Sequence, residues 1–140
     1  MIRRFMAPFV ALSLSTLALA APAETPAPSR DLAFGAYQRG DYKAALVEAK
    51  KRVDANPKDA AAQTLIGRLY LEGAGVTRDM KQAMDWFRRG ADNGDAEAAY
   101  LYGVGLLEGI DIAKDRARAR AYLEKAGVRE HAAALHLLGE

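Results

Sequence analysis

The side chains that could act as nucleophiles or metal ligands are few in this 140-residue chain. Serine occurs only at Ser13, Ser15 and Ser29, histidine only at His131 and His136, and cysteine is absent. If the first 23 residues are removed on export, as argued below, Ser29 is the one serine left. A Ser-His-Asp or Cys-His hydrolase needs an activated hydroxyl or thiol beside a base, so the sequence excludes both classes. The missing cysteines also exclude a thiolate metal site and a disulfide framework.

The remaining polar candidates favour structural roles. His131 and His136 are five residues apart, which does not place them on one helix face as paired ligands would be, so we expect no metal site. Asp79 and Asp115 are equivalent positions at the starts of two predicted helices, where a carboxylate caps free backbone N–H groups. Capping is favoured over a glycosidase carboxylate pair. We therefore expect no catalytic residue, no cofactor and no enzyme activity.

Composition and charge indicate one folded domain with a net charge close to zero. The chain is 51% hydrophobic and 27% charged, which is enough apolar material for a packed core. Twenty Lys and Arg against 18 Asp and Glu give a net charge of +2, and removing Arg3 and Arg4 would bring it to zero. A neutral protein does not attract polyanions over long range, so we expect no nucleic-acid partner.

The N-terminus has the pattern of a secretory signal peptide. Arg3 and Arg4 precede an almost uninterrupted apolar stretch from Phe5 to Ala21, and two small-residue cleavage patterns place the cut after Ala20 or Ala23. The alternative is an uncleaved anchor, but this stretch of 17 residues is marginal for spanning a bilayer. We predict a signal peptide at 1–23, a Pro-rich linker at 24–30, a periplasmic or secreted location, and no stable membrane span after cleavage.

The rest of the chain repeats itself with a period of 36 residues. Ala62, Leu65, Gly67, Gly73 and Ala83 recur 36 positions later as alanine, leucine, glycine, glycine and alanine. A third copy starts at Ala132 and is cut short by the end of the sequence. Self-similarity at such a fixed period is typical of a solenoid.

Each unit divides into two predicted helices. The first runs from about Asp59 to Glu72 and ends at Gly73 in a left-handed conformation, and Asp79 starts the second. Asp95 caps the next unit. Small residues, such as Gly67 and its equivalent in the next unit, allow the paired helices to approach closely. We predict an all-α, right-handed solenoid of antiparallel helix pairs, with units at 31–58, 59–95, 96–131 and the start of another at 132–140.

The residue pattern resembles a known repeat family. The run Leu65-x-Gly67-x-x-Tyr70-x-x-Gly73-x-Gly75-Val76-x-x-Asp79-x-x-x-Ala83-x-x-Trp86-Phe87 resembles the Sel-one-like repeat (SLR). Gly40-Asp41-Tyr42, Ala45 and Pro57 are similar to its parent, the tetratricopeptide repeat. In the second SLR unit Asp111 replaces the loop glycine. The resemblance implies that Trp86, Phe87 and Tyr122 are core residues.

The resemblance also implies a binding function. First-helix side chains in such solenoids point into a concave groove, where aromatic side chains and arginine dominate binding. The expectation is a non-catalytic scaffold that holds a protein or peptide partner; the alternative is a cell-envelope enzyme or a cell-wall-binding accessory protein. The C-terminal helix, about 129–139, has no following partner helix, so we expect it to be the least stable part or to mediate self-association. The predicted partner-binding residues are Phe34, Tyr37, Gln38, Thr64, Arg68, Glu72, Tyr100, Val104 and Glu108.

Overall fold

Six helices make up the part of the chain that the structure, a computed structural model, describes, which is residues 29–128. Within that range the structure has no strand. No helix of the same range is long and apolar enough to cross a membrane. The helices are α1 (Ser29–Gln38), α2 (Tyr42–Ala55), α3 (Ala60–Glu72), α4 (Met80–Asp92), α5 (Ala96–Glu108) and α6 (Arg116–Val128).

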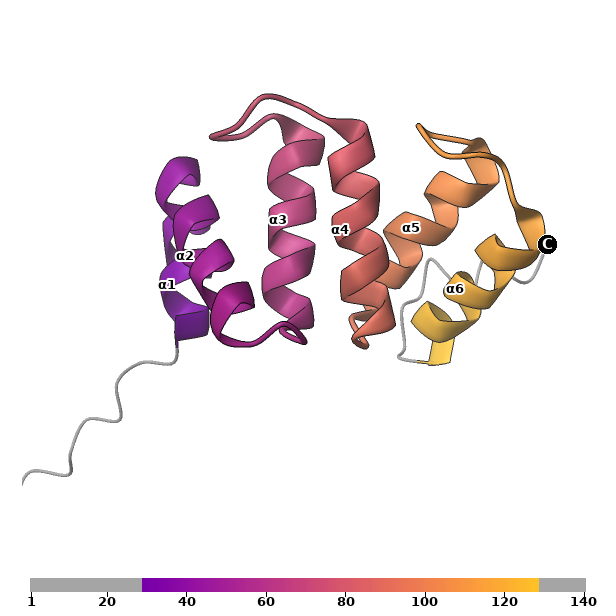
Figure 1. Ribbon diagram of the computed structural model, residues 1–140, viewed down its shortest axis with the longest axis horizontal. Coiled ribbons are helices and arrows are strands. Elements are labelled where there is room, and N and C mark those ends of the chain that lie inside the picture. Colours follow the sequence, from indigo (N-terminus) through magenta and orange to yellow (C-terminus); the bar gives the residue numbers. More distant parts are fainter. Residues whose placement is uncertain (1–28, 129–140) are drawn as a thin grey trace, which may run out of the picture.

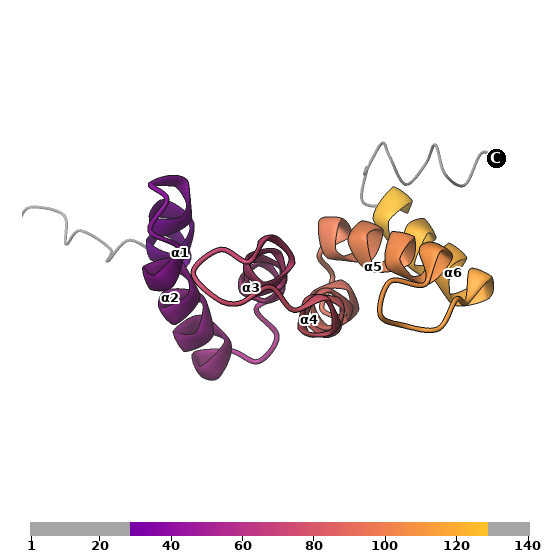
Figure 2. The same cartoon turned by 90° about the horizontal axis from the view of Figure 1, so that it is seen from above.

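The helices form three consecutive pairs, α1/α2, α3/α4 and α5/α6. Figure 1 shows them following one another along the long axis of the molecule in chain order. In Figure 2, the view from above, each pair packs beside the next. The prediction of an all-α solenoid of antiparallel helix pairs is therefore confirmed. We call α1, α3 and α5 the first helices and α2, α4 and α6 the second helices.

Aspartates open the helices, as the sequence predicts. The carboxylates of Asp41, Asp59, Asp79 and Asp95 each accept a hydrogen bond from a backbone N–H in the first turn of the helix that follows. Asp115 accepts in the same way from the backbone N–H of Arg118, at 2.9 Å. A carboxylate at this position satisfies free N–H donors and the positive end of the helix dipole. The predicted capping role of Asp79 and Asp115 is confirmed.

The glycines and alanines at equivalent repeat positions lie where paired helices touch. A Cβ atom at Gly67 would lie 2.6 Å from the ring of Phe87, and one at Gly103 would lie 2.8 Å from the side chain of Leu123. Ala83 and Ala119, on the partner helices, are fully buried. Since a close helix pair tolerates only small side chains at its crossing, the repeated small residues follow from packing.

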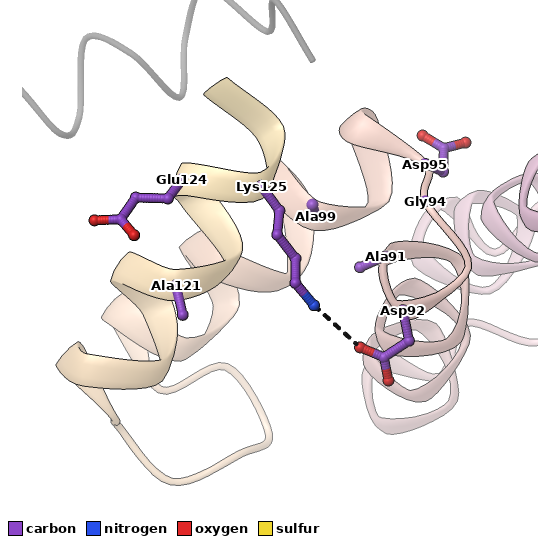
Figure 3. Close-up of a pocket in the computed structure, with 8 residues that line it drawn as sticks. All are labelled: Ala91, Asp92, Gly94, Asp95, Ala99, Ala121, Glu124 and Lys125. Carbon is purple, nitrogen blue, oxygen red and sulfur yellow. Dashed lines mark ion pairs between the residues drawn. The ribbon is translucent and has the colours of Figure 1, made fainter. Parts of the chain in front are cut away.

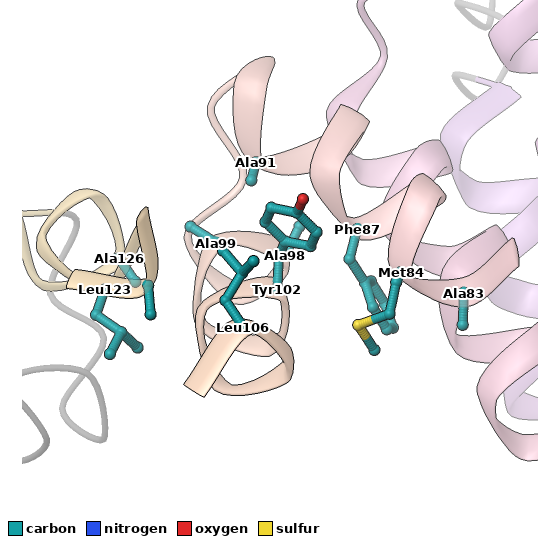
Figure 4. Close-up of a cluster of buried hydrophobic side chains, with 11 residues drawn as sticks. Ala83, Met84, Phe87, Ala91, Ala98, Ala99, Tyr102, Leu106, Leu123 and Ala126 are labelled. Carbon is teal, nitrogen blue, oxygen red and sulfur yellow. The ribbon is translucent and has the colours of Figure 1, made fainter. Parts of the chain in front are cut away.

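Two clusters of buried side chains fill the solenoid. One joins α4, α5 and α6 and includes Phe87, Leu106 and Leu123 (Figure 4). The other joins α1, α2 and α3 and includes Leu65 and Ile66. Tyr70 contacts both clusters, so the core is continuous across the repeats.

The three predicted core aromatics differ in burial. Phe87 is fully buried, as predicted. Trp86 and Tyr122 are only half-buried, and this corrects the prediction for both. The Arg89 guanidinium lies 4.6 Å from the centre of the Trp86 ring, and the Tyr122 hydroxyl donates to Asp92 at 2.8 Å. Both rings carry an N–H or O–H group, and such rings are stable with one edge packed and the polar edge near water.

Two local features refine the sequence prediction. Helix α1 begins at Ser29, so the last two residues of the predicted linker at 24–30 belong to the helix. Asp111 adopts a φ of 50°, in the left-handed region that Gly75 occupies at the equivalent place with a φ of 69°. Aspartate tolerates this region better than most residues, and the second SLR unit therefore keeps a left-handed residue in its loop without glycine.

Candidate partner-binding face

The nine predicted partner-binding residues all lie on the first helices. We call the surface that they form the first-helix face. Helix α1 contributes Phe34, Tyr37 and Gln38; α3 contributes Thr64, Arg68 and Glu72; α5 contributes Tyr100, Val104 and Glu108.

A polar network links the three first helices at the centre of this face. The Tyr37 hydroxyl on α1 donates to the Glu72 carboxylate on α3, at 3.1 Å from Oε1. Arg68, on α3, pairs with Glu97 on α5. These contacts connect residues 35 and 29 positions apart in the sequence. The structure therefore brings Tyr37, Arg68 and Glu72 together on the first-helix face, as binding through one common surface requires.

The electrostatics of the network follow from these contacts. Burial, and then the bond to the Glu72 carboxylate, raise the pKa of the Tyr37 hydroxyl above its ordinary value. Burial alone would lower the pKa of Arg68, but the ion pair with Glu97 reverses the effect and raises it. Tyr37 thus stays a neutral hydrogen-bond donor and Arg68 a fixed cation at neutral pH.

The face combines exposed polar groups with half-buried apolar ones. Gln38, Glu72 and Glu108 are exposed, whereas Phe34, Tyr37, Arg68, Tyr100 and Val104 are half-buried. Phe34 packs on the cluster of α1, α2 and α3, and Tyr100 packs on that of α4, α5 and α6. Side chains held in this way on rigid helices lose little conformational entropy when a partner covers them.

Thr64 does not lie on the open part of the face. Its side chain is buried, at 4% exposure. Its hydroxyl lies 2.8 Å from the carbonyl oxygen of Ala60 and 2.9 Å from the carboxylate of Asp95. Thr64 therefore joins α3 to the cap of α5, and it offers no accessible atom to a partner.

One contributor to this region is absent from the sequence prediction. Glu97 forms the ion pair with Arg68, but its equivalent one repeat earlier is Ala61, so the repeat pattern gives no signal for it. Leu71 and Leu107, which follow the first-helix register, pack against the cluster of α4, α5 and α6.

Metal binding has no candidate site among the described residues. Within the described part of the chain no group of three or more His, Asp or Glu side chains is arranged to hold a metal ion. His131 and His136, and the predicted C-terminal helix at 129–139, lie outside the described residues, as does the predicted signal peptide at 1–23. The first-helix face itself consists of aromatic rings, one arginine and several carboxylates.

Comparison with known proteins gives the same architecture. The family model for the Sel1 repeat matches residues 60–95 and 96–127. No curated protein matches the chain. A crystal structure of a Sel1 repeat protein from Oxalobacter formigenes matches with a TM-score of 0.67 and 29% identity over 76% of this chain. The structure of c5321, a protective antigen of uropathogenic Escherichia coli strains with an SLR fold, matches with a TM-score of 0.70 and 28% identity over 79% of this chain.

The two similar structures are longer than the segment that they share with this chain. The chain corresponds to 43% of the Oxalobacter protein and 24% of c5321. The match extends across both repeats and, in this chain, the predicted close contacts and caps occur where the repeat pattern places them. The chain is therefore an SLR protein of the tetratricopeptide-like class, with two consecutive Sel1 repeats at residues 60–95 and 96–127.

Proposed function

We propose that this protein is an exported, non-catalytic scaffold that binds a protein or peptide partner through the first-helix face. The observation that carries the proposal is the network of Tyr37, Glu72, Arg68 and Glu97, which joins three helices into one partly exposed surface. Sel1 repeats commonly mediate protein interactions, which supports a binding role. Arginine and aromatic side chains are the groups that most often dominate interface energies.

Export is the second part of the proposal. It rests on the sequence at 1–23, where two arginines precede an apolar stretch and small-residue cleavage sites. N-terminal sequencing of the protein recovered from the periplasm or medium is the direct test. We expect a start at Ala21 or Glu24, and a full-length product in the membrane fraction would contradict export.

Binding is tested by capture with face variants. The tagged chain, expressed in its own host, should capture a partner, and Tyr37→Ala with Tyr100→Ala should weaken that capture. Truncating a true anchor costs about 2 kcal/mol or more, which is about a thirtyfold loss of affinity. The far-ultraviolet circular dichroism of the variant should match the parent.

A matched control comes from the second helices. Arg120 has a side chain 73% exposed and lies on α6, away from the first helices. Arg120→Ala should leave capture unchanged. Equal loss in the control and in the tyrosine variant would mean that the interaction depends on overall charge or fold, and would contradict binding through the first-helix face.

A further inference from the structure

An asparagine-glycine pair, Asn93 and Gly94, lies in the turn that connects α4 to α5. Gly94 has a φ of 100°, in the left-handed region. The backbone N–H groups of Gly94 and Asp95 donate to the carbonyl oxygens of Ala91 and Gly90 at 3.0 and 2.9 Å. These two bonds form a helix C-cap that favours glycine at this position. Figure 3 shows Gly94 and Asp95 where the chain leaves α4. The fold therefore places glycine directly after Asn93.

An asparagine followed by glycine undergoes a reaction with water that needs no enzyme. The glycine backbone nitrogen loses its proton and attacks the asparagine Cγ, the Cγ–Nδ2 bond breaks, and ammonia leaves with that proton. Water then opens the five-membered succinimide ring, and the residue becomes aspartate or isoaspartate. Asn93 and Gly94 are the one such pair in the sequence. The other asparagine, Asn56, precedes proline, whose nitrogen has no proton to lose.

The folded chain keeps the reacting groups of this pair apart. Asn93 has a ψ of 7°, which places the Gly94 nitrogen beside the backbone nitrogen of Asn93 and away from its Cβ, so the ring cannot close. The Gly94 N–H is bonded to the Ala91 carbonyl, and the Asn93 side-chain amide donates to the Gln63 amide oxygen at 2.9 Å. Gln63 is itself fixed, because it is 3% exposed and donates to the Pro57 carbonyl at 2.7 Å. The reaction thus requires these bonds to Asn93 and Gly94 to break first.

The same turn is held against α3 by three side-chain contacts, which we call the repeat junction. They are Asn93 with Gln63, Asp95 with Thr64, and Glu97 with Arg68. The residue equivalent to Gln63 one repeat later is Ala99, which has no side-chain amide, so the contact made by Asn93 is specific to this junction. Folded proteins open locally without unfolding as a whole. Opening of the repeat junction is the local step that frees Asn93 to rotate.

We propose that Asn93 is a deamidation site that the closed repeat junction protects and that opening of the junction exposes. The modification is irreversible, and its product weakens the junction. An aspartate side chain has no N–H to donate to Gln63. Its charge also lies at the C-terminal end of α4, where the helix dipole is negative, and next to the carboxylates of Asp92 and Asp95 in the sequence. Partner binding is not required for this reaction.

The rate of modification in the folded chain is the direct test. The purified full chain is kept in mildly alkaline buffer, with and without guanidinium chloride, and the tryptic peptides that contain Asn93 and Asn56 are followed by mass spectrometry. We expect residue 93 to be converted in the unfolded chain, and at least about tenfold more slowly in the folded chain, because only open molecules react. Asn56 should stay unmodified in both samples.

The protective contact is tested by Gln63→Ala. This variant removes the acceptor of the Asn93 amide, so conversion of residue 93 should be at least about threefold faster than in the folded parent. Arg120→Ala, which removes an exposed ion pair on α6, is the control and should react at the parent rate. If Gln63→Ala does not fold, the two aspartate variants described next decide.

The effect of the product is tested with two matched variants, Asn93→Asp and Asn56→Asp. Asn56 also lies at the C-terminal end of a second helix, α2, but its side-chain oxygen accepts from the backbone N–H of Lys58 at 3.1 Å, a bond that a carboxylate keeps. Both variants place a negative charge at a helix C-terminus, so the difference between them reports the lost bond to Gln63. We expect Asn93→Asp to unfold at a lower urea concentration than Asn56→Asp.

Four results would overturn the proposal. They are equal rates of conversion in the folded and the unfolded chain, no conversion of residue 93 in the unfolded chain, a parent rate in folded Gln63→Ala, or unfolding of the two aspartate variants at the same urea concentration. Capture of a partner by the first-helix face is measured separately, and its outcome does not change these four.

Discussion

Gly67 of α3 faces the ring of Phe87 on α4 so closely that a Cβ atom at Gly67 would lie 2.6 Å from a ring carbon. Real Cβ contacts do not reach such distances, so any side chain here must displace the ring or the helix. Phe87 is fully buried and has no open space to move into. The same relationship recurs 36 residues later between Gly103 and Leu123. The same close contact therefore joins the two helices of each Sel1 repeat.

We expect Gly67→Ala to destabilise the chain although alanine favours helices. Overpacking a filled core costs about 1–3 kcal/mol, which exceeds the gain of up to about 1 kcal/mol in helix propensity. Urea unfolding followed by circular dichroism measures the change. Gly35→Ala is the control, because its Cβ would meet only the flexible end of Arg39, at 3.1 Å. That variant should be as stable as the parent or more so, and a loss equal to that of Gly67→Ala would contradict the packing argument.

The repeat pattern predicts these contacts because they are encoded locally. Gly67, Gly103, Asp79 and Asp115 recur at a fixed interval, and each has its role within one helix pair or one helix turn. The fold class, the helix starts and the left-handed Gly73 could thus be predicted from the residues. The burial of Trp86 could not, because it depends on how the ring packs against the cluster of α1, α2 and α3.

The candidate face was harder to predict than the fold, since its contacts join different repeats. The pairing of Arg68 with Glu97 requires the twist from α3 to α5, which no residue type encodes alone. For the same reason the repeat register predicted that Thr64 lies among the partner-binding residues. The structure instead buries Thr64 against Asp95. Differences between repeats, such as Gln63 against Ala99, become informative only when the side-chain contacts are known.

The two intra-repeat loops should respond differently to exchange of their left-handed residues. Asp111→Gly should change the stability by less than about 1 kcal/mol, because glycine adopts the φ of 50° freely but gains entropy when unfolded. Gly75→Asp should cost about 1–3 kcal/mol, because a Cβ there would also lie 2.6 Å from the backbone of Tyr42 on α2. Thermal unfolding of the two single variants compares them. Equal losses would show that the loop contact with α2 has no energetic role.

Arg52 is expected to be the least replaceable charged residue among those that the structure describes. Its guanidinium is nearly buried, at 4% exposure, and its Nε and Nη2 atoms donate to the two carboxylate oxygens of Asp59 at 2.9 and 2.8 Å. Asp59 also caps α3, so this pair fixes α2 against the first Sel1 repeat. Arg52→Ala leaves the carboxylate without its cation and should cost about 3–5 kcal/mol in urea unfolding.

The conservative variant separates charge from geometry. Arg52→Lys keeps the positive charge but cannot form the two-pronged contact, so we expect it to recover only part of the loss. The exposed Arg120, which pairs with Glu124 in one turn of α6, is the control. Arg120→Ala should cost at most about 0.5 kcal/mol. Full recovery by Arg52→Lys would show that the contact is a simple charge pair.

Alkaline pH should weaken the fold through Tyr122. Burial, followed by the hydrogen bond that its hydroxyl donates to Asp92, raises the pKa of Tyr122 from 10.0 to about 12. Since the unfolded chain loses this proton first, the unfolded state binds fewer protons than the folded state between pH 10 and 12. The stabilisation is complete below pH 10 and is lost as the pH rises through about 12. Tyr122→Phe removes the titrating group, so its stability should fall less steeply across that interval.

The Tyr122 prediction is measured by urea unfolding at a series of pH values, with phenolate absorbance recorded in parallel. A steep slope that persists in Tyr122→Phe would assign the alkaline loss to other groups. Tyr37, whose pKa is also raised by burial and by Glu72, would then be the next residue to replace, because its hydroxyl bridges α1 and α3 as that of Tyr122 bridges α6 and α4.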